Sequence, residues 1–121
     1  MLGKYGEQLA LQYLKSKGYL LVEQNFRCRL GEFDLILRDK GVLVFVEVKT
    51  RQSTAYGAPF EAVGWIKQKR MVRLAQLYLK LRMRSLSVLS RFDIIAINVD
   101  EPGHEQIRHL INAFATAKYS N

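Results

Sequence analysis

Cysteine and long apolar runs are scarce in this sequence, and each scarcity excludes a class of protein. The one cysteine, Cys28, rules out an internal disulfide framework and a metal cage made of protein thiolates, so we expect it to be a small, half-buried apolar residue. No stretch reaches the about 18 uninterrupted apolar residues of a membrane span. The start of the chain, MLGKYGEQLALQYLK, lacks the residue order of a secretory signal. We therefore expect a cytoplasmic protein that does not enter a membrane.

Linker-type sequence is also missing. Two prolines and eight scattered glycines form no Ser/Gly linker, repeat or low-complexity tract. The chain has 121 residues, 49% of them hydrophobic, with six Phe and six Tyr, which is enough for one sizeable core. The sequence predicts a single domain over residues 1–121.

Acidic residues are few relative to basic ones, with 11 Asp and Glu against 19 Lys and Arg, which gives a net charge of +8. Such an excess on a small domain favours polyanionic partners, DNA or RNA. A basic surface that merely keeps the protein soluble is the alternative. An anionic membrane surface is a weaker option, because no expected helix pairs a broad apolar face with a uniformly basic one.

Several catalytic signatures are absent. The sequence shows no Gly-rich phosphate loop, serine nucleophile elbow or Cys/His pair. His104 and His109 lack partners at metal-ligand spacing, so a histidine-based nuclease is not expected. Asp93, within the apolar stretch RFDIIAI, is expected to have a structural role and to pair with Arg91.

The order of expected elements indicates an α/β domain. Apolar residues recur at helical spacing from about Tyr5 to Ser16, and Gly18 is a natural stop. Three strands joined by short connections then suggest an antiparallel meander: YLLVEQNF, GEFDLILR and VLVFVEVKT. The irregular RQSTAYGAPFEAVG is a candidate lid, and the clearest helix follows, WIKQKRMVRLAQLYLKLRMR. After the strand FDIIAINV comes QIRHLINAF, as a strand or a short helix, so we expect a mixed sheet flanked by helices.

The second and third strands have a preferred register. If Lys40 and Gly41 are the central residues of the hairpin turn, one side of the ribbon is wholly apolar. That side pairs Phe33 with Val48, Leu35 with Val46 and Leu37 with Val44. A slip of one residue would scatter this apolar set.

The other side of the ribbon carries acids. Asp34 faces Glu47 there, and Glu32 faces Lys49. Directly opposed side chains have Cβ atoms about 4.5–5.5 Å apart, where like charges repel, and burial enlarges the penalty unless a proton or a cation lies between them. Mg²⁺ or Mn²⁺ fits such a pair, because these cations take one or two carboxylates together with water and phosphate oxygens. The structural alternative is a wet face on which Lys49 and Glu32 form an exposed ion pair.

These residues also resemble a known motif. An acid followed on the next strand by Glu-x-Lys, here Asp34 and then Glu47 and Lys49, is similar to the PD-(D/E)XK nuclease motif. Five ordered blocks resemble the uncharacterised bacterial YraN-like family: GEQLALQYL, GYLLVEQNFR, GEFDLI, VFVEVKTR and EAVGWIKQKR. That family has a restriction-endonuclease-like fold and similarity to archaeal Holliday junction resolvases. The likeness runs from about Gly3 to Asn98.

The resemblance implies site residues. Asp34 and Glu47 would be metal ligands, Lys49 would assist catalysis, and Glu7 on the first helix matches a further resolvase acid. The alternative for Glu7 is a partly exposed first-turn residue favoured by the helix dipole. No proline precedes the Asp of the motif, where EFD stands instead. The resemblance also implies a homodimer, because resolvases pair symmetrically on junctions.

A basic cluster is the candidate nucleic-acid contact. Arg51 follows the Glu-x-Lys strand, and Lys67, Lys69, Arg70 and Arg73 lie in the first turns of the long helix. They are expected to hold phosphates on either side of a scissile bond, unless they form an ordinary solvated helix face. We therefore expect a metal-dependent endonuclease acting on DNA, favoured over RNA, with branched or repair intermediates as candidate substrates. The alternatives are a non-catalytic nucleic-acid-binding domain of the same fold and a protein-interaction adaptor.

Overall fold

The computed structural model describes residues 2–52, 64–100 and 103–114. Within these ranges the chain forms two α-helices, a short π-helix (η1) and five strands. In chain order they are α1 (Leu2–Ser16), β1 (Leu20–Cys28), β2 (Gly31–Asp39), β3 (Val42–Arg51), α2 (Trp65–Tyr78), η1 (Leu79–Met83), β4 (Ser90–Val99) and β5 (Glu105–Leu110). In these parts of the chain no helix combines the length and the apolar character needed to cross a membrane.

The five strands form one mixed sheet in the order β1-β2-β3-β4-β5. The first three strands are antiparallel neighbours, which confirms the meander. Because α2 carries the chain back to the other end of the sheet, β4 then runs parallel to β3. The segment whose identity the sequence left open is the strand β5, antiparallel to β4. The candidate lid lies almost wholly outside the described residues.

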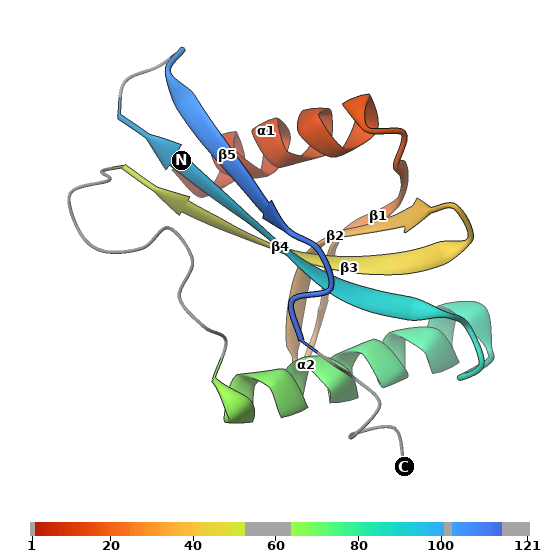
Figure 1. Ribbon diagram of the computed structural model, residues 1–121. Coiled ribbons are helices and arrows are strands. Elements are labelled where there is room, and N and C mark those ends of the chain that lie inside the picture. Colours follow the sequence, from red (N-terminus) through yellow and green to blue (C-terminus); the bar gives the residue numbers. More distant parts are fainter. Residues whose placement is uncertain (1, 53–63, 101–102, 115–121) are drawn as a thin grey trace.

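The two helices cover opposite faces of the sheet (Figure 1). Under α1, Ala10 and Leu14 are fully buried against apolar residues of β2, β3 and β4. Under α2, buried residues such as Val72 and Tyr78 pack on a sheet face rich in phenylalanine. The helix expected from WIKQKRMVRLAQLYLKLRMR is therefore present, although its last turn is the π-helix η1.

Two glycines fix the position of α1. Gly18 adopts a φ of 94°, a left-handed conformation that ends the helix as expected. Gly6 packs directly on β3, because a Cβ built there would lie 1.9 Å from the Thr50 hydroxyl oxygen. A residue with a side chain at this position would push the start of α1 away from the sheet.

The β2–β3 hairpin has the expected register where the two strands pair. The pairs run from Asp39 opposite Val42 to Leu35 opposite Val46, and both turn residues, Lys40 and Gly41, have positive φ. The pairing then stops.

The expectation of one wholly apolar side is wrong at Phe33. This ring belongs to the cluster under α2, 4.7 Å from the Phe45 ring centroid, whereas Leu35 and Leu37 lie under α1. Neither the β1–β2 nor the β2–β3 ladder includes Asp34. An irregular backbone at this residue therefore changes the alternation and turns Phe33 to the other face.

Candidate active site at the fork between two strands

Asp34 lies where β2 and β3 separate. Beyond the last paired residues, its carboxylate Oδ2 accepts a hydrogen bond of 2.8 Å from the backbone N–H of Val48. A side chain thus takes the place of a ladder bond between the two strands. Asp34 and Glu47 are consequently not a ladder pair, which corrects the expected direct opposition.

Burial and neighbouring acids act on Asp34. Burial raises the pKa of this carboxyl group to about 6, against the lowering effect of the Val48 N–H, and the charges of Glu7, Glu47 and Glu32 raise it further. The residues concerned come from α1, β2 and β3. Glu7, which is half-buried, is therefore close enough to act on Asp34 from the adjacent helix, next to the tight contact of Gly6.

Glu47 is compensated at one oxygen. Its Oε1 lies 2.6 Å from Nζ of Lys67, in the first turn of α2. Its Oε2 is buried and has no hydrogen-bond partner among the described residues. Leaving a buried carboxylate oxygen unsatisfied costs about 1–3 kcal/mol or more. The atom is therefore well placed to receive a cation or a water molecule.

A cavity of about 150 Å³ opens beside Glu47. Its polar lining comes from Glu32, Glu47, Lys67 and Arg70, and its apolar lining from Leu30, β2 and α2. This volume holds several water molecules. The cavity brings carboxylates and cations together at the fork.

The carboxylates of Asp34 and Glu47 fit a hard divalent cation that takes most of its ligands from water and substrate. Within the described ranges, no three Asp, Glu, His or Cys side chains are gathered into a ready-made metal cage. Mg²⁺ is commonly held by one or two carboxylates, with water and substrate phosphates completing its shell. Asp34 and Glu47, with the unsatisfied Oε2, fit this open kind of site and not a closed one.

Lys49 follows Glu47 by two residues on β3 and so lies on the same face of the strand. The expected alternative, an ion pair with Glu32, is not found among the described residues. Glu32 pairs instead with Arg27 at 2.8 Å. Lys49 is half-buried and stands opposite Ala96 of β4, while Arg51 is the last residue of β3.

The remaining basic residues surround a second cavity, of about 350 Å³. It is lined by Lys69, Arg70 and Arg73, as well as by residues that the sequence reasoning missed: Arg29, Leu30, Trp65 and Ile66. Arg70 and Leu30 line both this cavity and the one beside Glu47. The sequence feature that could have indicated this cavity is the tryptophan directly before the basic cluster.

Asp93 is fully buried and structural, and its expected pairing with Arg91 is confirmed at 3.0 Å. His109 Nε2 lies 2.7 Å from the same carboxylate, and the Asn112 backbone N–H donates to it at 2.9 Å. Burial would raise the pKa of Asp93, but hydrogen bonds from His109, Arg91 and Asn112 lower it below its ordinary value. His109 is thus tied to an internal network.

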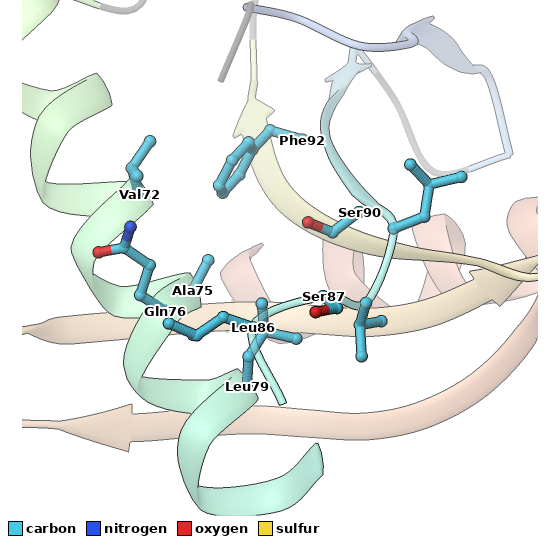
Figure 2. A pocket seen from close by; sticks show the side chains of 10 residues that line it. Val72, Ala75, Gln76, Leu79, Leu86, Ser87, Ser90 and Phe92 are labelled. Atoms are coloured by element: carbon cyan, nitrogen blue, oxygen red, sulfur yellow. The ribbon is translucent and has the colours of Figure 1, made fainter. Parts of the chain in front are cut away.

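Another cavity, of about 290 Å³, lies between α2 and the segment that leads into β4 (Figure 2). Its lining includes Val72, Leu86 and Phe92, together with serine hydroxyls and the Gln76 amide. None of the ten described residues that line it is ionisable. It offers no acid, base or metal ligand.

Comparison with known proteins gives a consistent family. The model of the uncharacterised protein family UPF0102 matches residues 6–97. A UPF0102 protein of Caldanaerobacter subterraneus subsp. tengcongensis is 45% identical over 114 residues, which cover 93% of each chain. One of Clostridium botulinum strain Hall is 45% identical over 96 residues, covering 79% of this chain and 78% of the relative.

Proposed function

The chain belongs to the uncharacterised protein family UPF0102, the YraN-like family that its sequence blocks resemble, and we propose that it is a metal-dependent nuclease that hydrolyses phosphodiester bonds in DNA. One observation carries the proposal: the buried Oε2 of Glu47, which has no hydrogen-bond partner among the described residues and belongs to a carboxylate whose charge raises the pKa of Asp34. A purely structural strand pair gains nothing from such a cluster of acids on a protein of charge +8.

The architecture supports a restriction-endonuclease-like fold. The order of helix, three antiparallel strands, helix and parallel strand is the one that the nuclease resemblance implies. The fold alone does not determine activity, because related scaffolds also bind without cutting. The proposal therefore rests on the residues at the fork.

Asp34 and Glu47 would hold Mg²⁺ or Mn²⁺, which supplies an activated water and charge stabilisation at the phosphate. The Val48 N–H fixes the orientation of Asp34, whose carboxyl group is ionised above about pH 6. Lys49, on the same face as Glu47, would orient the attacking water or stabilise charge on the phosphate. Glu7 would act on the site from α1 through a water molecule.

Lys67 would have two roles in the proposed reaction, one in the free protein and one with substrate bound. Its ammonium group neutralises Glu47 in the free protein, at 2.6 Å. If Glu47 held a cation, the Lys67 ammonium would be free to contact a substrate phosphate. Lys69, Arg70 and Arg73 would hold neighbouring phosphates along α2.

The test is a cleavage panel of end-labelled single strands, duplexes, flaps and four-way junctions, each with Mg²⁺, Mn²⁺ or EDTA. We expect wild type to cut at least one substrate with metal only. Asp34→Asn keeps the oxygen that accepts the Val48 N–H, so it removes charge without removing that contact, and we expect at least about a 100-fold loss of rate. The activity is refuted for this panel if wild type cuts none of the substrates.

The second candidate is a non-catalytic DNA-binding domain, and the Glu47–Lys67 pair favours it, because this contact compensates one ligand oxygen without any metal. Calorimetric titration with Mn²⁺ separates the two candidates. A nuclease site binds Mn²⁺ in wild type and loses this binding in Asp34→Asn. A binding domain shows no Mn²⁺ binding but retains salt-sensitive affinity for DNA.

A further inference from the structure

The start of α2 exposes two large apolar side chains in a basic setting. Trp65 is 59% exposed and Ile66 is 68% exposed. They line the 350 Å³ cavity together with Arg29, Lys69, Arg70 and Arg73. An exposed tryptophan among four cations is unusual for a surface that meets water alone.

The chemistry of this cavity matches a nucleotide. The ammonium of Lys69 lies 4.4 Å from the Trp65 ring centroid, so the indole is already held in a cation–π contact while most of its surface faces solvent. The flat indole suits a base, and the cations around it suit the attached phosphates. The N-cap of α2, Gly64, makes no side-chain cap, and the positive end of the helix dipole at this point also favours an anion.

We propose that this cavity binds an unpaired nucleotide of DNA, with its base stacked on Trp65 and its phosphates held by Arg29, Arg70 and Arg73. The inference rests on the DNA binding that both candidate functions under the proposed function share, and it specifies the class of DNA that is bound. In a continuous duplex the faces of the bases are covered by their neighbours and cannot reach the indole. DNA with a single-stranded segment, an overhang or a branch point presents such a base.

The location connects this cavity to the fork. Arg70 and Leu30 line both cavities, and Glu47 and Lys67 line the one at the fork. A strand whose unpaired base occupies the Trp65 cavity therefore brings a nearby phosphate toward Glu47. The expected cutting position is close to the junction between paired and unpaired DNA.

The binding test uses Trp65 itself, because it is the one tryptophan of the chain. Intrinsic fluorescence is titrated in EDTA with an oligothymidylate, a duplex with an overhang and a blunt duplex of equal phosphate content. We expect quenching by the first two and little change with the blunt duplex. Cleavage is not needed for this measurement, so its outcome is independent of nuclease activity.

Variants separate stacking from charge. Labelled-oligonucleotide anisotropy should show that Trp65→Ala weakens single-strand binding by roughly 5- to 150-fold, the effect of losing one base stack. Trp65→Phe should recover part of that loss, and Leu89→Ala, at an exposed apolar residue of another cavity, should change nothing. Arg73→Ala should weaken binding to single strands and to duplex alike.

The outcomes distinguish this inference from the proposed function. Equal quenching by blunt duplex and single strand overturns the inference, as does unchanged single-strand affinity in Trp65→Ala, even if metal-dependent cleavage is found. Concentration-dependent fluorescence without DNA, together with loss of a dimer in Trp65→Ala, also overturns it in favour of a protein contact. Quenching by unpaired DNA without any cleavage leaves the inference standing and removes the nuclease.

Discussion

Replacing Asp34 by Asn is expected to stabilise the protein at neutral pH. The pKa of Asp34 is raised from 3.8 to about 6 in the folded state, mainly by burial. Since one pKa unit corresponds to about 1.36 kcal/mol, ionising this group costs the folded protein about 3 kcal/mol at pH 7. Solvent screening of the partly exposed carboxylate reduces the figure, so we expect a gain of about 2–3 kcal/mol in the free energy of unfolding.

The pH dependence has a defined sign. Because the folded state holds this proton more tightly than the unfolded chain, the stabilising effect of protonation is full below about pH 4 and is lost as pH rises through about 6. Urea unfolding of wild type and Asp34→Asn in EDTA, from pH 4 to pH 7.5, should give a difference that grows with pH and levels off near pH 7. Millimolar Mn²⁺ at pH 7 should stabilise wild type and leave the variant unchanged.

A matched control lies on the same strand. Asp39 is also half-buried, but its carboxylate pairs with Arg91 at 3.1 Å, so Asp39→Asn should lower stability at pH 7. The reasoning about Asp34 is refuted if Asp34→Asn is less stable than wild type at pH 7. It is refuted equally if the stability difference is flat between pH 4 and pH 7.

Three other changes test separate parts of the structure. Lys67→Ala removes the cation that competes at Glu47, so calorimetry should show about fivefold tighter Mn²⁺ binding, while weaker or unchanged binding would contradict the proposed exchange. Gly6→Ala forces a methyl group into β3 and should lower the free energy of unfolding in urea by about 1–3 kcal/mol. The control is Gly3→Ala, where a built Cβ meets no described atom within 4 Å, and it should be neutral or slightly stabilising. Equal effects of the two substitutions would refute the close contact at Gly6. Asp93→Asn should cost about 3–5 kcal/mol by the same assay, because it removes the fully buried one of the two carboxylates that compensate the largely buried Arg91 guanidinium, and a cost below about 1 kcal/mol would speak against a structural role.

Local patterns predicted most of the fold. Alternating apolar residues and a Lys-Gly turn determine the hairpin register, since a slip of one residue would expose the apolar side. The helical spacing along α2 and the stop at Gly18 were likewise sufficient to place both helices. The sequence predicted a mixed sheet, and the sheet is mixed because β3 pairs in parallel with β4.

The geometry at the fork was not predictable from alternation. A regular strand would direct Asp34 to the face of Ile36 and would keep Phe33 on the side of Leu35. Instead Asn25 on β1 adopts a φ of 53°, both ladders omit Asp34, and Phe33 turns to the other face. Such an irregularity arises because a side chain, here the Asp34 carboxylate, competes with the neighbouring strand for a backbone N–H. The spacing of apolar residues in the sequence does not predict the outcome of that competition. The pairing of Lys67 with Glu47 was missed for a related reason, because the approach of α2 to β3 depends on packing of the whole sheet.

The hydrogen bond between Val48 and Asp34 has a spectroscopic consequence. A backbone N–H that donates to a titrating carboxylate changes its chemical shift and its solvent-exchange rate as the acceptor changes charge. The Val48 amide resonance should therefore move with a midpoint near pH 6 in metal-free protein, and saturation with Mg²⁺ should shift that midpoint to lower pH. One backbone signal can thus follow the state of the carboxylate before any substrate is known.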